Sequence, residues 1–221
     1  MSPTPDIGPS GYVTVQRVEY MARLRPFFSD DEMEFVEQAY FLSKYAHRPQ
    51  TRDDGARYFE HPKTVAWLLA VEFNVHDWRT IVIALLHDLL EDSYIMTPRF
   101  IGRTFDKKVK RGVKLLSKND FRPAEVGDVD AAYYNRFITD GDWRVLMVKL
   151  VDRIHNLATM DGMNSQRVAR KLEETRFFFP PLERALIERI PTKYLPQARE
   201  IISTLAFCIF EREQWLEEQA I

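Results

Sequence analysis

Four polar residues stand in the most apolar stretch of the sequence, and their types suit metal chemistry. They are His87, Asp88, Glu91 and Asp92. Most of the other side chains between residues 77 and 92 are Leu, Ile, Val or Ala, which predicts a buried helix. A buried, ionised carboxylate costs free energy unless a cation or hydrogen bonds compensate. From residue 81 onward the stretch holds no Lys or Arg, so the positive charge must come from another segment or from a metal ion.

A second apolar stretch, residues 143–160, repeats this pattern. Asp152 lies among Val, Leu, Ile and Met residues, and Asn156 follows one helical turn later on the same face. Lys149 or Arg153 could neutralise Asp152 at the edge of the helix, which is the purely structural interpretation. Two apolar helices that each bury an aspartate favour a shared metal ion over two independent ion pairs.

A mixed site of His and Asp ligands for a borderline metal calls for a further neutral nitrogen. Four histidines other than His87 are available. His61 is the best placed of them, because it lies at a loop-to-helix junction directly before Pro62, although composition alone does not single it out. His155, next to Asn156, could pack in the core or support the site residues, and we favour packing.

Helices must position these residues, since no alternating strand pattern is present. Helical spacing and capping residues predict helices over residues 30–47, 62–73, 77–92, 97–105, 142–160 and 165–179. Further helix is expected after Pro180-Pro181 and Pro191, up to the C-terminus. Residues 48–60 hold Pro49, Gly55 and charges of both signs, which is typical of a loop. The predicted fold class is all-α.

Composition excludes several kinds of protein. The chain has 221 residues, of which 45% are hydrophobic, so it is long and apolar enough to bury a core and is not disordered. The formal net charge of -2 argues against binding nucleic acid or an anionic membrane. A single cysteine and the lack of a signal or membrane-spanning stretch indicate a cytoplasmic protein. The run of eight Lys or Arg against one acid in residues 99–118 is interpreted first as a solvated helix face and second as an approach for phosphates.

Four ordered motifs carry a resemblance. They are the loop HRPQTRDDGARYFEHP ending at His61-Pro62, LLHDLLED at 85–92, KLVDRIHNLATM at 149–160 and RVARKLEETRFFFPPLERAL from residue 167. Over roughly residues 33–190 the chain resembles the HD-type hydrolase domain of the RelA/SpoT homologue family. The resemblance implies an HD-domain helical bundle that removes the 3′-pyrophosphate of the alarmone nucleotides (p)ppGpp with one Mn²⁺ ion per site.

The resemblance also implies residue roles. The expected metal ligands are His61, His87, Asp88 and Asp152. Glu91 and Asp92 match an acidic pair that orients or deprotonates the attacking water, which agrees with the ability of a carboxylate to accept that proton. Arg52 matches a residue that stacks on the base, and Asn156 matches one that contacts the sugar. Lys149 and Thr159 are the further residues expected to bind substrate.

We expect three parts in the chain. Residues 1–29 are predicted to form a partly irregular N-terminal arm, of which residues 1–18 lie outside the core. Residues 30–190 are expected to form the HD-type hydrolase domain, and residues 191–221 a helical extension. The extension is apolar, so it packs on the domain or forms an oligomer contact. The chain resembles the stand-alone small alarmone hydrolases, which leaves three partners to consider: the nucleotide substrate, a second copy of the chain and a toxic alarmone synthetase.

Two positions beside Arg52 depart from the family pattern and leave the base open. Asp53 and Asp54 stand where family members have a basic and a small polar residue. The alternatives to (p)ppGpp are therefore (pp)pApp and the 2′-phosphate of NADPH. A catalytically silent nucleotide sensor or antitoxin is a further alternative, which the Glu91 and Asp92 pair disfavours. A nucleic-acid phosphodiesterase is disfavoured by the net charge.

Overall fold

The computed structural model describes residues 11–92, 96–118 and 128–219. Its helices are α1 (Arg17–Leu24), α2 (Asp30–Ala46), α3 (Glu60–Trp67), α4 (Trp78–Leu86), α5 (Leu89–Asp92), α6 (Pro98–Thr104), α7 (Lys107–Leu116), α9 (Val129–Asp140), α10 (Trp143–Ala158), α11 (Ser165–Arg189) and α12 (Leu195–Gln219). Within the described ranges the one element of β type is an isolated bridge between Thr51 and Arg57. The all-α prediction is confirmed.

Polar side chains fix the starts of α2, α4 and α10. Ser29 and Glu32 form a reciprocal capping box at the start of α2. The carboxylate of Asp77 accepts a hydrogen bond from the backbone N–H of Thr80 at the start of α4, and Asp142 does the same for α10. The predicted starts of these three helices therefore agree with the structure.

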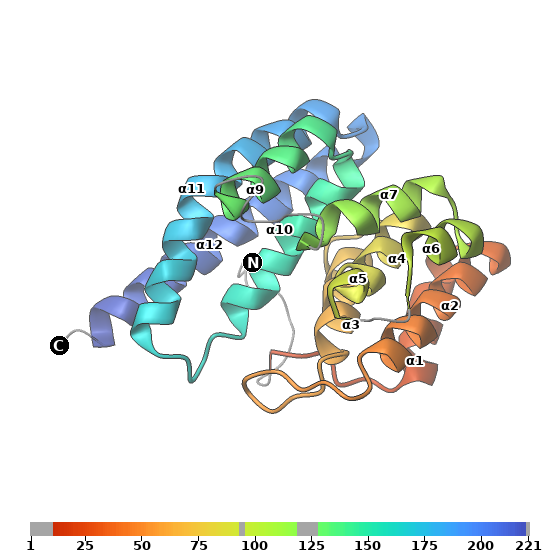
Figure 1. Ribbon diagram of the computed structural model, residues 1–221, viewed down its shortest axis with the longest axis horizontal. Helices are drawn as coiled ribbons and strands as arrows, with labels where there is room; N and C mark the ends of the chain where they lie inside the picture. The colour runs from red at the N-terminus through yellow and green to blue at the C-terminus, as the bar shows by residue number, and fades with distance from the viewer. Residues whose placement is uncertain (1–10, 93–95, 119–127, 220–221) are drawn as a thin grey trace.

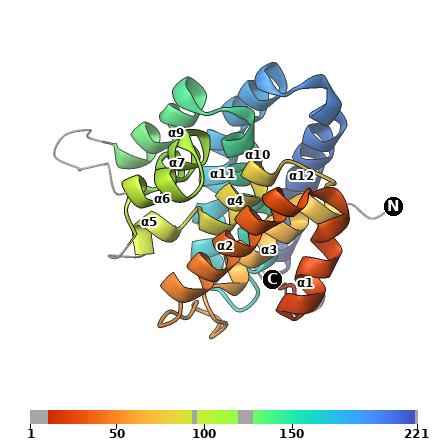
Figure 2. The ribbon, with the colours of Figure 1, turned by 90° about the vertical axis from the view of Figure 1, so that its right-hand side faces the viewer.

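Helix α10 is the centre of the arrangement. It packs against α3, α4 and α7 on one side and against α11 and α12 on the other (Figure 1). Figure 2 shows α1 and α2 on the face nearest the viewer, and α2 packs on α4. Because α10 is buried along most of its length, Asp152 lies inside the bundle, next to the helices that carry the histidines.

The helix expected over residues 77–92 is interrupted. Helix α4 ends at Leu86, His87 and Asp88 form a turn, and α5 begins at Leu89. The ring Nδ1–H of His87 donates to the backbone carbonyl of Ala84 at 2.7 Å. This side-chain bond uses a carbonyl that a continuous helix would give to a backbone N–H, so the chain turns where the two polar side chains stand.

The expectation that Pro180-Pro181 separates two helices is wrong. Helix α11 continues through both prolines to Arg189. A proline inside a helix costs about 3 kcal/mol or more. The buried side chains of Phe179, Leu182 and Leu186 continue one apolar face across the prolines and offset this cost.

The N-terminal arm is not outside the core. Tyr12, Val13, Tyr20 and Leu24 are buried, and the ring of Tyr20 packs against that of Trp67. Residues 1–10 of the predicted arm lie outside the described residues. At the other end α12 packs along α10 and α11, while the predicted division at residues 29 and 190 stays a prediction. None of the helices in the described ranges is long and apolar enough to cross a membrane.

Candidate metal centre and substrate pocket

Three helical segments bring two histidines and two aspartates together. His61 lies in the first turn of α3, His87 and Asp88 lie at the turn between α4 and α5, and Asp152 lies on α10. His61 Nε2 is 3.1 Å from Asp152 Oδ1, 3.2 Å from His87 Nε2 and 3.7 Å from Asp88 Oδ2. His87 Nε2 is 3.2 Å from Asp88 Oδ2 and 3.8 Å from Asp152 Oδ1. His61, His87 and Asp88 therefore form a group that could hold a metal ion, and Asp152 adjoins it through the two imidazoles.

The tautomer of His61 follows from its hydrogen bonds. His155 Nε2 lies 2.9 Å from the carbonyl oxygen of Gly11, so this nitrogen carries the proton. Burial lowers the pKa of His155 well below its usual value, so its Nδ1 atom is a bare acceptor. His61 Nδ1 lies 2.7 Å from that atom and must donate to it. The Nε2 atom of His61 is therefore a lone pair aimed into the cluster.

The tautomer of His87 follows from its hydrogen bonds in the same way. Its Nδ1–H donates to Ala84, so in the neutral ring the Nε2 atom is also a lone pair. Two imidazole lone pairs and two carboxylates would then face one another with no donor between them. Atoms that are adjacent on an octahedron of about 2.1 Å radius lie about 3 Å apart, near the distances found here. The donor set of two nitrogens and two oxygens fits a divalent metal ion.

The pKa values show how the cluster holds together without a metal. Burial lowers the pKa of His61 to about 4, although Asp152, which favours the protonated ring, opposes the shift. Burial also lowers the pKa of His87, but the charge and hydrogen bond of Asp88, the charge of Asp152 and the hydrogen bond to Ala84 together outweigh it and raise that pKa to about 9. Burial opposes ionisation of Asp88 and Asp152, yet nearby cations hold both pKa values below the usual range. The protonated ring of His87 thus supplies the positive charge that a metal ion would otherwise supply to the two carboxylates.

Asp152 also has polar partners on its own helix. Lys149 Nζ is 3.0 Å from Asp152 Oδ2, and Asn156 Nδ2 donates to Asp152 Oδ1 at 2.6 Å. The ion pair between Lys149 and Asp152, which a purely structural role would predict, is therefore present. It uses Oδ2 of Asp152 and leaves Oδ1 beside the imidazoles. Lys149 is buried and lies over the ring of Tyr133. Its expected contact with substrate stays a prediction.

Of the acidic pair expected to activate water, Glu91 and Asp92, the structure describes the side chain of Glu91. Glu91 is exposed on α5, and its carboxylate accepts a hydrogen bond from the backbone N–H of Lys118. Asp92 ends the same helix, but its side chain lies outside the described structure. The negative charge of Glu91 also raises the pKa of buried Tyr133, after the larger effect of burial. The role expected for the pair in activating water stays a prediction.

A cavity of about 410 Å³ is lined by two of the residues expected to bind substrate, Arg52 and Thr159. It is lined by Arg52, Asp53, Asp54, Thr159, Asp161, Gly162, Met163, Asn164 and Arg167. Arg52 Nη2 donates to Asn156 Oδ1 at 3.0 Å, and Asn156 donates in turn to Asp152. This chain of hydrogen bonds links the cavity to the metal centre. The hydroxyl of Thr159 donates to the carbonyl of His155, so Thr159 faces the cavity with its hydroxyl already engaged.

Asp53 and Asp54, the two carboxylates that differ from the family pattern, both have partners within the protein. Asp53 Oδ2 is 2.8 Å from Arg167 Nη2 on α11. The hydroxyl of Tyr12 donates to Asp54 Oδ2 at 2.6 Å, and the backbone N–H of Ala56 donates to Asp54 Oδ1. Burial and then Asp54 raise the pKa of Tyr12 to about 12, so its hydroxyl stays a donor. The N-terminal segment therefore forms part of the wall near the cavity.

Sequence reasoning missed two residues that act on the metal centre. The hydroxyl of Tyr58 donates to Asp88 Oδ2 at 3.0 Å. His155 is not a packing residue alone, because it connects Gly11 to His61. Tyr58 carried a signal, since it is the one tyrosine in a polar loop just before His61. For His155 the only signal was its position on the same helix as Asp152.

The comparisons with known proteins decide the family. The model of the HD domain family matches residues 39–186. The chain belongs to the HD domain family. Relatives of this HD domain include the bifunctional (p)ppGpp synthase/hydrolase SpoT of Escherichia coli (strain K12), which is 32% identical over 176 residues, or 77% of this chain and 24% of SpoT. The GTP pyrophosphokinase rsh of Brucella melitensis biotype 1 is 30% identical over 205 residues, or 91% of this chain and 26% of its own length.

The predicted relation to the RelA/SpoT homologues is therefore confirmed, and the HD domain spans about a quarter of the length of these curated relatives. A solved structure, described as a metazoan ortholog of SpoT that hydrolyzes ppGpp, has a TM-score of 0.59 at 20% identity. The match covers 80% of this chain and 96% of the other. It shows that the two proteins share a fold.

Proposed function

We propose that this HD domain is a metal-dependent hydrolase that removes the 3′-pyrophosphate of (p)ppGpp. The observation that carries the proposal is the cluster of two imidazoles and two carboxylates beside an arginine-lined cavity. Relatives whose names include (p)ppGpp synthase/hydrolase and guanosine-3′,5′-bis(diphosphate) 3′-pyrophosphohydrolase support the choice of substrate.

The resident ion we propose is one Mn²⁺, held by His61, His87, Asp88 and Asp152. Such a set of imidazole and carboxylate ligands suits Mn²⁺ among other divalent ions. When bound, the ion supplies a Lewis acid for the phosphates and lowers the pKa of water. The protein's part is to fix these side chains: Tyr58 orients Asp88 and Asn156 orients Asp152.

The remaining residues have roles in binding and proton transfer. Glu91, with Asp92, accepts the proton of the attacking water, since it is an ionisable carboxylate one turn after His87. Arg52 places the nucleotide: its planar guanidinium donates to Asn156 and lies over the ring of Tyr58, and such a guanidinium also suits stacking on a base. Lys149 and Thr159 complete the substrate contacts. A second copy of the chain and a toxic synthetase as partners, and cytoplasmic location, stay predictions from sequence.

The base preference is the open point of the proposal, and a direct assay settles it. We expect ppGpp and pppGpp to release pyrophosphate in the presence of Mn²⁺, with no release when a chelator is present. ppApp, pppApp and NADPH are the comparison substrates. Release from adenosine substrates only would refute the guanine assignment and make Asp53 and Asp54 the determinants of base choice. No release from any of them would favour a silent sensor or antitoxin.

A matched pair of variants tests the metal centre. Asp88→Ala removes a carboxylate from the cluster, so we expect Mn²⁺ binding and turnover to be lost together. Asp140→Ala is the control, because Asp140 is exposed and pairs with Arg111 on the surface. Full activity of Asp88→Ala would overturn the metal assignment.

A further inference from the structure

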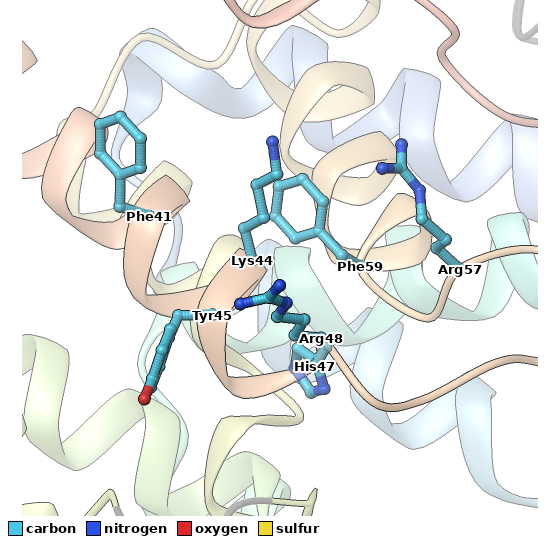
Figure 3. Close-up of a pocket in the computed structure, with 7 residues that line it drawn as sticks. All are labelled: Phe41, Lys44, Tyr45, His47, Arg48, Arg57 and Phe59. Atoms are coloured by element: carbon cyan, nitrogen blue, oxygen red, sulfur yellow. The ribbon is translucent and has the colours of Figure 1, made fainter.

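A second concave site lies outside the metal centre, between the C-terminal half of α2 and the loop that follows it. We call it the α2 pocket; its volume is about 520 Å³, and it is lined by Phe41, Lys44, Tyr45, His47, Arg48, Arg57 and Phe59. Figure 3 shows Lys44 drawn between the rings of Phe41 and Phe59, with Arg48 and Arg57 nearby. None of these residues lines the 410 Å³ cavity.

The charge of the α2 pocket is of one sign. Lys44, Arg48 and Arg57 line it, and no carboxylate does. The carboxylate of Glu60, at the edge, is already shared by Arg57 and Lys63. Among the described residues, no carboxylate lies within ion-pair distance of Lys44 or Arg48. Lys44 and Arg48 therefore present two positive charges to one concavity, and these charges repel each other unless an anion joins them.

Aromatic rings form the rest of the wall. Phe41 is 49% exposed and Tyr45 is 61% exposed, which is unusual for side chains of this size. Phe59 is buried and also lines the pocket. Aromatic rings and arginine guanidinium groups both stack on nucleobases, while Lys and Arg bind phosphates. The lining therefore matches a ligand that combines a flat ring with several negative charges.

We propose that the α2 pocket is a second binding site, for a purine nucleoside polyphosphate. The volume lies within the usual range for small-molecule sites, about 300–1,000 Å³. The grouping of cations around a concavity, and not along an extended face, favours a compact ligand over an acidic protein surface. The site is distinct from the metal centre in both its residues and its chemistry.

Two connections link the α2 pocket to the metal centre. The ring of His47 stacks on Tyr58 with 4.8 Å between centroids, and the Tyr58 hydroxyl donates to Asp88. The bridge between Thr51 and Arg57 closes a short turn, which places Arg57 at the pocket and Arg52 at the substrate cavity. A ligand that holds Arg57 therefore fixes the turn that positions Arg52. Occupancy of the pocket is coupled to substrate binding.

Calorimetry with GTP in the presence of a chelator tests the binding. We expect the double variant Lys44→Ala with Arg48→Ala to weaken GTP binding about tenfold or more, because each removes a charge-assisted contact. The double variant Arg103→Ala with Lys107→Ala makes the same charge change on α6 and α7 and should leave the affinity unchanged. Equal affinities for both double variants would overturn the site, and so would the absence of GTP binding.

Separate controls test whether the pocket binds a nucleoside polyphosphate or only phosphate. Phe41→Ala should weaken GTP while inorganic triphosphate, which has no ring, loses nothing by this change. Circular dichroism of each variant checks the fold, and all the substituted side chains are exposed. If inorganic triphosphate binds as tightly as GTP to the unmodified protein, the pocket is a phosphate site and the nucleoside assignment is wrong.

The coupling is measured separately and rests on the proposed function. We expect saturating GTP to lower the KM for ppGpp about fivefold or more in the unmodified protein and to have no effect in the Lys44 and Arg48 double variant. GTP binding without any change in KM would refute the coupling. A chain that binds GTP at the α2 pocket but does not hydrolyse ppGpp would refute the proposed function and leave the site standing.

Discussion

The proton on His87 makes the stability of the metal-free protein depend on pH. Burial lowers the pKa of His87, but Asp88, through its charge and hydrogen bond, acts together with Asp152 and the Ala84 carbonyl to raise the pKa from 6.5 to about 9. Because the folded value is the higher one, the stabilisation is fully present below pH 6.5 and is lost as the pH rises through 9. We expect the free energy of unfolding of the metal-free protein to fall by about 2 kcal/mol between pH 6.5 and pH 8.5.

Metal binding should change in the opposite direction over the same range. An ion that binds His87 Nε2 must displace its proton, so each pH unit below 9 weakens the apparent affinity about tenfold. We expect Mn²⁺ to bind about 80-fold more tightly at pH 8.5 than at pH 6.5, with nearly one proton released per ion at pH 7. His61 contributes no proton, because its pKa is about 4.

Urea unfolding and Mn²⁺ titration at three pH values measure both trends. His87→Gln should flatten the dependence of unfolding on pH. His76→Gln is the matched control, since His76 stacks on Phe27 and lies outside the cluster, and it should keep the full slope. Calorimetry in buffers of different ionisation enthalpy counts the released protons. A constant unfolding free energy together with a constant Mn²⁺ affinity would refute the assignment of the proton to His87.

Three further outcomes follow from the geometry. His155→Leu removes the acceptor of the His61 proton and should weaken Mn²⁺ binding about 10–100-fold, as measured by titration; an unchanged affinity would contradict the tautomer argument. Glu91→Gln should lower turnover about 100-fold or more with Mn²⁺ affinity unchanged, and an unaltered rate would remove Glu91 from the chemistry. Arg153→Leu leaves the Glu174 carboxylate without its buried partner and should cost about 3 kcal/mol in urea unfolding, which Glu174→Leu in the same chain should largely restore.

The sequence predicted the residues of the cluster better than the path of the backbone through it. Two apolar stretches, each predicted to bury an aspartate, were enough to suggest a common cation. The turn at His87 and Asp88 was not foreseeable, because the helical period of the apolar residues continues across it. The bond from the His87 ring to Ala84 that accompanies the turn exists only in the folded geometry.

Contacts between distant parts of the chain explain the other errors. Gly11 and His155 are 144 positions apart, and His61 and His155 are 94 apart, so local pattern could not show that these residues act together. The arm was predicted to lie outside the core because its first residues lack periodicity. Its burial comes from Tyr12 and Val13, two single side chains that fit against helices formed much later in the sequence.

Helix α10 shows why a buried charge cannot be assigned from sequence alone. Asp152 and Arg153 are adjacent, so their side chains point about 100° apart around the helix axis. Asp152 faces the imidazoles of α3 and α4, whereas Arg153 faces Tyr134 and Glu174 on α9 and α11. The sequence allowed the two neighbours to neutralise each other, but the helix separates them into two networks. Because Arg153 pairs with Glu174 and Tyr134, it does not neutralise Asp152, whose carboxylate faces the imidazoles.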